Sequence, residues 1–403
     1  MSTGVDGAGT PGMVPVVGET ESAESDLDLL RETVRRVATG AIAPEVAGME
    51  RRGAMPEAVF KALVETDFHA AGVPTRHGGA GAGTLEAVVV IEEVARVSAA
   101  ASVIPAQGFV ASCALGGVEA GSEQGEILAA VANGELVATS PFAGSGTGGV
   151  AAKAVPDGWS LEGALDRVPW PYPGAEVALL AAVETEGGPR LLARRLGETE
   201  AGIGEAKPML GFRGVPLRSL RFAGQEVQRG AITTEAGQRQ VVLWRSARLI
   251  ATAAQATGVA VMALEAAAGY VRERRQFGRA IGDFQALRVM LADMATRVES
   301  ARRLTYAAAA AIESSAGPET VRLAASAKLH ASDTAMSVAT DAVQLFGGYG
   351  FMKDYPVERA MRDAKMTQLL AGDRLEQQCT IANILARAGS VSALDSAFPR
   401  PGW

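Results

Sequence analysis

The chain has 403 residues, 48% of them hydrophobic and 21% charged, which is enough for two or three packed domains with a large core. Its 38 basic and 45 acidic residues give a net charge of −7, so there is no overall basic field to hold a nucleic acid or an anionic membrane. Two cysteines and three histidines, scattered along the sequence, argue against a disulfide framework or a zinc site, and we expect no metal.

The first domain is predicted to be helical. Residues 1–24 are rich in Gly, Ser, Thr and Glu and have no periodic apolar face, so we expect a flexible tail. Residues 25–135 carry apolar side chains at helical spacing, broken by prolines and by a glycine-rich loop at 78–83. That loop is not preceded by a strand, and Thr84 stands where a dinucleotide fingerprint needs its third glycine. We therefore interpret it as a turn between helices.

A β domain and a helical bundle are predicted to follow. Between residues 136 and 235, short apolar runs alternate with Gly, Pro and Asp, which favours a sandwich or barrel. Residues 236–390 form longer helical patterns, typical of a four-helix bundle, in which Gly269 and several alanine runs would let helices approach closely. Residues 391–403 are expected to be a tail. The predicted fold class is α+β, mainly α.

The sequence shows no targeting segment. The first basic residue is Arg31, so the N-terminus lacks the charged region of a secretory signal, and no apolar run approaches the roughly 18 residues of a membrane span. We expect a cytoplasmic protein with no membrane partner.

Two segments carry specific motifs. Residues 271–295 read VRERRQFGRAIGDFQALRVMLADMA, and residues 344–368 read QLFGGYGFMKDYPVERAMRDAKMTQ. Both closely resemble the acyl-CoA dehydrogenase superfamily, in the right order and at the right separation, and the resemblance extends over roughly residues 26–388. It implies a helical domain, a central β domain and a C-terminal four-helix bundle that binds FAD.

The resemblance assigns several residues to FAD. By themselves, the arginines between 272 and 279 are compatible with a solvated charge cluster at the end of a helix. The family places one of them on the pyrophosphate, where a guanidinium can bind as a fork. A neighbouring subunit's FAD would meet two glycines, whose backbone can approach a phosphate because no Cβ intervenes. The residues implied are Arg274, Phe277, Gln285, Gln344, Gly347 and Gly348.

The loop that faces the flavin is altered. The family pattern is Thr-Glu-Pro, any residue, then Ala-Gly-Ser-Asp, and this chain has TSPFAGSG from residue 139. The resemblance therefore implies that Thr139 contacts the flavin and that Ser145 contacts the substrate. The two carboxylates of the pattern are replaced by Ser140 and Gly146, so we expect the substrate side of the pocket to differ.

The catalytic glutamate of the family is missing. Oxidation of an acyl thioester needs a carboxylate within reach of the α-proton. Counting along the motifs puts the usual base position at Ala371 and the rarer position at Arg248. Asp373 and Glu376 lie close in sequence, but the first falls at a FAD-contacting threonine and the second well into the next helix, where a solvent-facing or capping role is expected.

Three functions remain open. Without the base, we favour a flavin-dependent monooxygenase that hydroxylates a small aromatic or natural-product substrate with O2 and reduced flavin from a separate reductase. Arg248 would then lie in the cavity, suited to a carboxylate or a peroxy anion. The alternatives are an acyl-CoA or acyl-carrier-protein dehydrogenase with a relocated base, and a non-catalytic subunit that completes FAD sites of a partner. The shared FAD site implies a homo-oligomer, a dimer or a tetramer.

Overall fold

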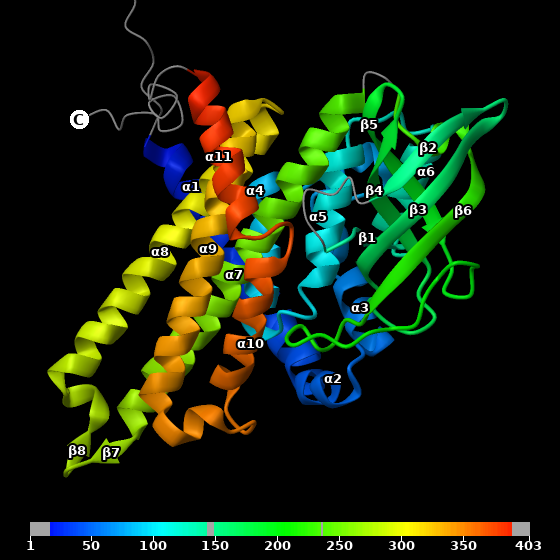
Figure 1. Ribbon diagram of the computed structural model, residues 1–403. Helices are drawn as coiled ribbons and strands as arrows, with labels where there is room; N and C mark the ends of the chain where they lie inside the picture. The colour runs from blue at the N-terminus through cyan, green and yellow to red at the C-terminus, as the bar shows by residue number, and fades with distance from the viewer. Residues whose placement is uncertain (1–16, 143–148, 235–236, 389–403) are drawn as a thin grey trace, which may run out of the picture.

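The computed structural model describes residues 17–142, 149–234 and 237–388. Figure 1 shows long, roughly parallel helices on one side of the molecule and a sheet on the other, with α5 between them. The predicted succession of helical domain, β domain and helical bundle is confirmed.

The first helices lie between residues 17 and 132. They are α1 (Val17–Val37), α2 (Val46–Arg52), α3 (Glu57–Val64), α4 (Thr84–Val97), α5 (Val103–Leu115) and α6 (Glu123–Ala132). Helix α1 begins at Val17, inside the segment that composition assigned to a tail, because the Glu- and Ala-containing stretch there favours a helix despite its lack of a periodic apolar face. The loop at 78–83 is a turn before α4, with Gly78 and Gly81 at positive φ.

The β domain is a single six-stranded sheet. Its strands are β1 (Val137–Thr139), β2 (Val150–Val155), β3 (Gly158–Pro169), β4 (Val177–Thr185), β5 (Gly188–Leu196) and β6 (Leu217–Gln228). The order is β1-β4-β2-β3-β6, with β5 paired to β4. The β1–β4 and β2–β4 pairs are parallel and the other pairs antiparallel. The short strand β1 also packs on α5, so the loop after Thr139 leaves the sheet at the boundary with the helices.

The C-terminal bundle is built on one central helix. Its helices are α7 (Gln238–Glu273), α8 (Gln285–Ser314), α9 (Pro318–Phe346), α10 (Pro356–Leu369) and α11 (Arg374–Ala388), with the hairpin β7 (Arg275–Gln276) and β8 (Arg279–Ala280) after α7 and the turn η8 (Gly347–Phe351) after α9. Helix α7 packs against α4, α5, α8, α9 and α10. Gly258 permits the α4 contact, because a Cβ there would lie 2.3 Å from the carbonyl oxygen of Glu92, whereas Gly269 has no atom within 4 Å of such a Cβ and serves no close approach.

Helix α7 contradicts the expectation that no apolar run is long enough to span a membrane. It is long and apolar enough to cross a membrane, with a mean hydropathy of 1.5 over its most apolar window. However, 83% of that window is buried inside the protein, as in the core helix of a globular fold. The polar residues Thr252, Gln255 and Thr257 interrupt the apolar sequence of α7, so it does not appear as an unbroken apolar run.

Asp363 joins the bundle to the loop before β6. Its carboxylate, 3% exposed, accepts a hydrogen bond of 2.7 Å from the backbone N–H of Phe212, which has a positive φ of 54°. Burial raises the pKa of Asp363 to about 6, against the lowering effects of the Phe212 hydrogen bond and of Arg359. The folded protein therefore binds this proton more tightly than the unfolded chain, and the charged form destabilises the fold as the pH rises through about 6.

We expect the stability of Asp363→Asn to increase relative to that of wild type as the pH rises. Asparagine keeps the oxygen that accepts from Phe212 but cannot ionise, so its free energy of unfolding should gain about 1 kcal/mol on wild type between pH 5 and pH 8. Urea unfolding at several pH values measures this. The exposed Asp166→Asn is the control, and a pH-independent difference at position 363 would refute the assignment.

Candidate active site

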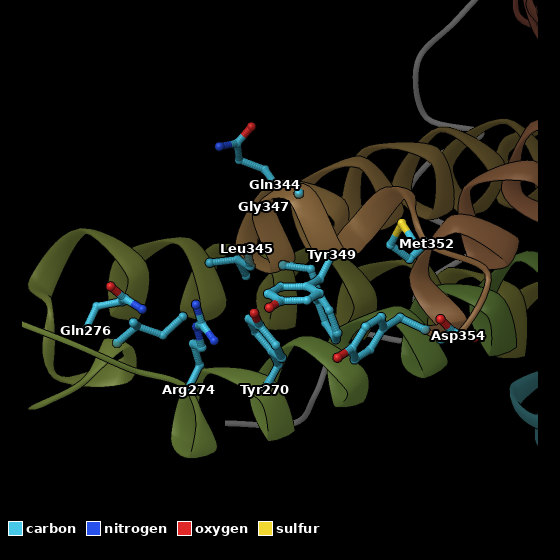
Figure 2. A pocket seen from close by; sticks show the side chains of 13 residues that line it. Tyr270, Arg274, Gln276, Gln344, Leu345, Gly347, Tyr349, Met352 and Asp354 are labelled. Atoms are coloured by element: carbon cyan, nitrogen blue, oxygen red, sulfur yellow. The ribbon is translucent and has the colours of Figure 1, made fainter.

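One end of the bundle forms an open cavity of about 610 Å³. The end of α7, the last residues of α9 and η8 line it, and Figure 2 shows Arg274, Tyr270 and Tyr349 facing one another across it. Arg274 is the C-terminal cap of α7, and its guanidinium lies 5.4 Å from the ring centroid of Tyr349. Tyr270 stacks on Phe346 with ring centroids 4.1 Å apart, which fixes the floor of the cavity.

Two glycines leave bare backbone at this cavity. Gly347 has a φ of 59°, and a Cβ on either Gly347 or Gly348 would meet no atom within 4 Å. Both line the cavity together with Arg274, while Gln344, also a lining residue, points its side chain away in Figure 2. A guanidinium beside backbone that no Cβ covers lets a pyrophosphate approach closely and bind the guanidinium as a fork.

Phe277 and Gln285 lie away from this cavity. Phe277 occupies the tip of the β7–β8 hairpin with a positive φ of 52° and is 92% exposed, and its ring packs edge-on against Phe284. Gln285 is the first residue of α8 and is exposed. Neither lines the cavity within this chain, so their predicted contacts with FAD stay predictions that would involve a second subunit.

The loop predicted to face the flavin begins in the interior. Thr139 is 1% exposed, and its hydroxyl donates a hydrogen bond of 2.7 Å to the carbonyl oxygen of Pro169. Ser140, fully buried, accepts one of 3.2 Å from the indole N–H of Trp244. Ser145 lies outside the described residues, so its predicted substrate contact is not addressed by the structure.

The two positions at which the family carries its catalytic glutamate both lie at one small cavity. Arg248 and Ala371 both line a space of about 20 Å³ between α5, α7, Pro141–Phe142 and Leu370–Ala371. Such a volume holds about one water molecule, so an acyl chain or a ring would enter only if the walls moved apart. Among the described residues, the lining includes no carboxylate; its polar side chains are Gln107, Arg248, Thr252 and Gln255.

Arg248 is a buried cation at this cavity. It is 6% exposed, and its guanidinium donates to the carbonyl oxygen of Pro141 and lies 4.4 Å from the ring centroid of Trp244. Burial lowers its pKa to about 10, while Glu376 raises it and Arg245 lowers it. The guanidinium therefore stays charged at neutral pH and brings positive charge to the cavity wall.

The turn that carries Ala371 is held from three sides. Ala371 has a positive φ of 54°, and its N–H donates 3.0 Å to the carbonyl oxygen of Phe142. Its own carbonyl oxygen accepts from the side chain of Gln377 at 3.1 Å. Lys328, 1% exposed, donates to the carbonyl oxygens of Gln368 and Gly372, and burial lowers its pKa to about 8. The turn is thus a fixed wall of the cavity.

Asp373 and Glu376 take different roles. The carboxylate of Asp373 accepts the backbone N–H of Glu376 at 3.0 Å and so caps the start of α11. Glu376 is half-buried, and its Oε2 lies 2.7 Å from the position of a Cβ on Gly372. Its side chain therefore folds back over the turn rather than facing solvent. In the sequence, Gly372 directly follows Ala371 and lies four residues before Glu376, and a glycine in this turn leaves room for a nearby side chain.

Comparisons with known proteins agree with this architecture. Residues 24–135 match the family model "Acyl-CoA dehydrogenase, N-terminal domain", and residues 246–386 match "Acyl-CoA dehydrogenase, C-terminal domain". The chain is similar to the probable acyl-CoA dehydrogenase FadE25 of Mycobacterium tuberculosis, at 36% identity over 89% of this chain and 95% of that protein. It is also similar to the short-chain specific acyl-CoA dehydrogenase of Clostridium acetobutylicum, at 32% identity over 89% and 98% of the two chains.

Among solved structures, butyryl-CoA dehydrogenase from Megasphaera elsdenii superposes with a TM-score of 0.79 at 27% identity, covering 90% of this chain and 98% of that one. The chain belongs to the acyl-CoA dehydrogenase family, and it is a flavin-dependent oxidoreductase whose cofactor is FAD. The open cavity with Arg274 and the two glycines fits the pyrophosphate of that cofactor.

Sequence reasoning missed the aromatic lining of the FAD cavity. Tyr270, Phe346, Tyr349 and Tyr355 gather there in a chain that is only 5% aromatic. Three of these four residues lie in the second motif segment, 344–368, so their concentration could have been noticed. Tyr270 could not, because only the crossing of α7 and α9 brings it beside Phe346.

Proposed function

We propose that this protein oxidises an acyl thioester at its α,β-bond, with FAD as the electron acceptor. The observation that carries the proposal is the open cavity lined by Arg274, Gly347 and Gly348, which suits the pyrophosphate of FAD in a chain of the acyl-CoA dehydrogenase family. The names of the related proteins, which describe acyl-CoA dehydrogenases along nearly the whole chain, support the same substrate class.

A flavin-dependent monooxygenase is the second candidate. The absence of a carboxylate from the described cavity lining, and the presence of the Arg248 guanidinium in it, favour a reaction that needs no α-carbon base. Such an enzyme would take reduced flavin from a separate reductase and use O2. FAD can support either reaction, so the residues around it decide.

Product analysis separates the two. The FAD-loaded protein is incubated without O2 with a panel of acyl-CoA esters and an artificial electron acceptor, and the products are analysed by mass spectrometry. We expect products lighter by two hydrogens. Hydroxylated phenols or indoles, heavier by one oxygen and formed only with O2, NADH and a reductase, would support the monooxygenase instead. A protein that gains FAD only when mixed with a second gene product would instead be a subunit that completes a partner's site.

We also propose that the protein acts as a homo-oligomer. Phe277 and Phe351 are 92% and 79% exposed near the FAD cavity, and large apolar side chains are seldom left so exposed without a partner surface. Size-exclusion chromatography with light scattering tests this, and a monomer at micromolar concentration would contradict it.

A further inference from the structure

We propose that Tyr349 is a positioning residue for FAD, because its ring holds the guanidinium of Arg274 in place for the pyrophosphate. The inference needs the FAD cavity but neither of the two candidate reactions. It adds to that cavity a side chain that acts on the cofactor through Arg274 rather than by touching it.

An aromatic ring, rather than a carboxylate, holds Arg274. The guanidinium lies over the ring of Tyr349 at 5.4 Å from its centroid, within the roughly 6 Å of a cation–π contact. Among the described residues, Arg274 forms no ion pair, although the carboxylate of Asp354 lines the same cavity. In this part of the chain, the ring of Tyr349 is therefore what restrains the charged end of the arginine.

A ring and a carboxylate leave different groups of an arginine available. Carboxylate oxygens accept from the same paired N–H groups that grip a phosphate as a fork, so an ion pair would compete with the cofactor. An aromatic ring attracts the cation through its π-electrons and does not take the fork. The contact with Tyr349 thus restrains Arg274 and leaves its N–H groups for the pyrophosphate.

Tyr349 is itself held in place by its neighbours. Its carbonyl oxygen accepts a hydrogen bond of 3.0 Å from the backbone N–H of Met352. Gly350 lets η8 lie directly against α9, because a Cβ there would be 2.6 Å from the carbonyl oxygen of Val343. The ring of Tyr349 packs edge-on against Tyr355, with centroids 5.7 Å apart.

Further ring contacts join Tyr349 to the helix that carries Arg274. Tyr355 lies edge-on to Phe346 at 5.4 Å and to Tyr270 at 6.3 Å between centroids. Tyr270 precedes Arg274 by one turn of α7, and its carbonyl oxygen accepts the Arg274 backbone N–H at 2.8 Å. Figure 2 shows Tyr270 and Tyr349 beside the guanidinium. The linked rings therefore fix Tyr349 relative to Arg274.

A double-mutant cycle on FAD affinity tests the proposal. The FAD-free forms of wild type, Tyr349→Leu, Arg274→Ala and the double variant are each titrated with FAD, and flavin fluorescence gives the dissociation constants. We expect Tyr349→Leu to weaken binding about 3- to 10-fold, the strength of a partly exposed cation–π contact. In the Arg274→Ala background the same change should cost less than about two-fold, because no guanidinium remains for the ring to hold.

Two further variants separate positioning from a general structural role. Tyr349→Phe keeps the ring and loses only the hydroxyl, so it should bind FAD within about two-fold of wild type. Trp159→Leu on β3 removes a comparable contact outside the FAD cavity, where the guanidinium of Arg190 lies 5.3 Å from the ring centroid, and it should also bind like wild type. The thermal midpoint and elution volume of each FAD-free variant report its fold and assembly.

Three results would overturn the role given to Tyr349. One is an unchanged affinity in Tyr349→Leu. Another is an equal loss with and without Arg274, because the ring would then act on FAD directly. The third is a loss in Tyr349→Phe as large as in Tyr349→Leu, which would assign the effect to the hydroxyl. None of these results bears on acyl-thioester oxidation, which is judged by its products.

Discussion

Replacing Arg274 with alanine should weaken FAD binding by about 10- to 100-fold, since a charge-assisted hydrogen bond to a phosphate contributes roughly 1.5–3 kcal/mol. The guanidinium lies at the edge of the open cavity, beside the bare backbone of Gly347 and Gly348. Reconstitution of the FAD-free protein, followed by flavin fluorescence, measures the dissociation constant.

The neighbouring Arg275 provides the control for this prediction. It is exposed on β7 and does not line the cavity, so Arg275→Ala should bind FAD within a few-fold of wild type. Arg274→Lys keeps the charge but loses the planar fork, and we expect an intermediate affinity. Equal loss of affinity in Arg274→Ala and Arg275→Ala would show that only the general charge of the hairpin matters.

Replacing Glu92 with alanine should lower the free energy of unfolding by about 3 kcal/mol, because it leaves partly buried partners without their counter-charge. Glu92 is 2% exposed on α4 and receives hydrogen bonds from two residues of α8: 2.8 Å from Arg302 and 2.9 Å from the hydroxyl of Tyr306. Burial and the nearby Glu92 raise the pKa of Tyr306, so the hydroxyl stays protonated and donates. This pair of contacts ties the N-terminal domain to the bundle.

An exposed ion pair gives the comparison for Glu92. Glu57 and Lys61 are spaced one helical turn apart on α3 with side chains 56% and 65% exposed. Such pairs contribute little, so Glu57→Ala should cost less than about 0.5 kcal/mol. Urea unfolding of the FAD-loaded proteins checks both variants, and a Glu92→Ala variant as stable as Glu57→Ala would contradict the role given to the buried contacts.

The fold was largely predictable because its signals are local. Helical periodicity, turn residues and the two motif segments were enough to predict the bundle and the β domain. Counting residues along the motifs identified Ala371 and Arg248, which line one cavity. Counting residues along the motifs could not predict the size of this cavity. Its small volume depends on how α5, α7 and the turn pack together, which no spacing along one segment reveals.

The same limit applies to other residues at the site. Glu376 was assigned a solvent-facing or capping role from its place in a helix, but Asp373 takes the cap and Gly372 opens space for the glutamate to fold back. Phe277 and Gln285, assigned to FAD by resemblance, lie outside the cavity of their own chain. Contacts across subunits depend on how two chains assemble, which residue spacing within one chain does not encode.

Anaerobic addition of acyl-CoA esters to the purified, FAD-loaded protein tests the central claim most directly. If the protein oxidises acyl thioesters, at least one short-chain ester should bleach the visible absorption of the oxidised flavin. A flavin spectrum that stays unchanged with every ester, in a protein that binds FAD normally, would contradict acyl-thioester oxidation.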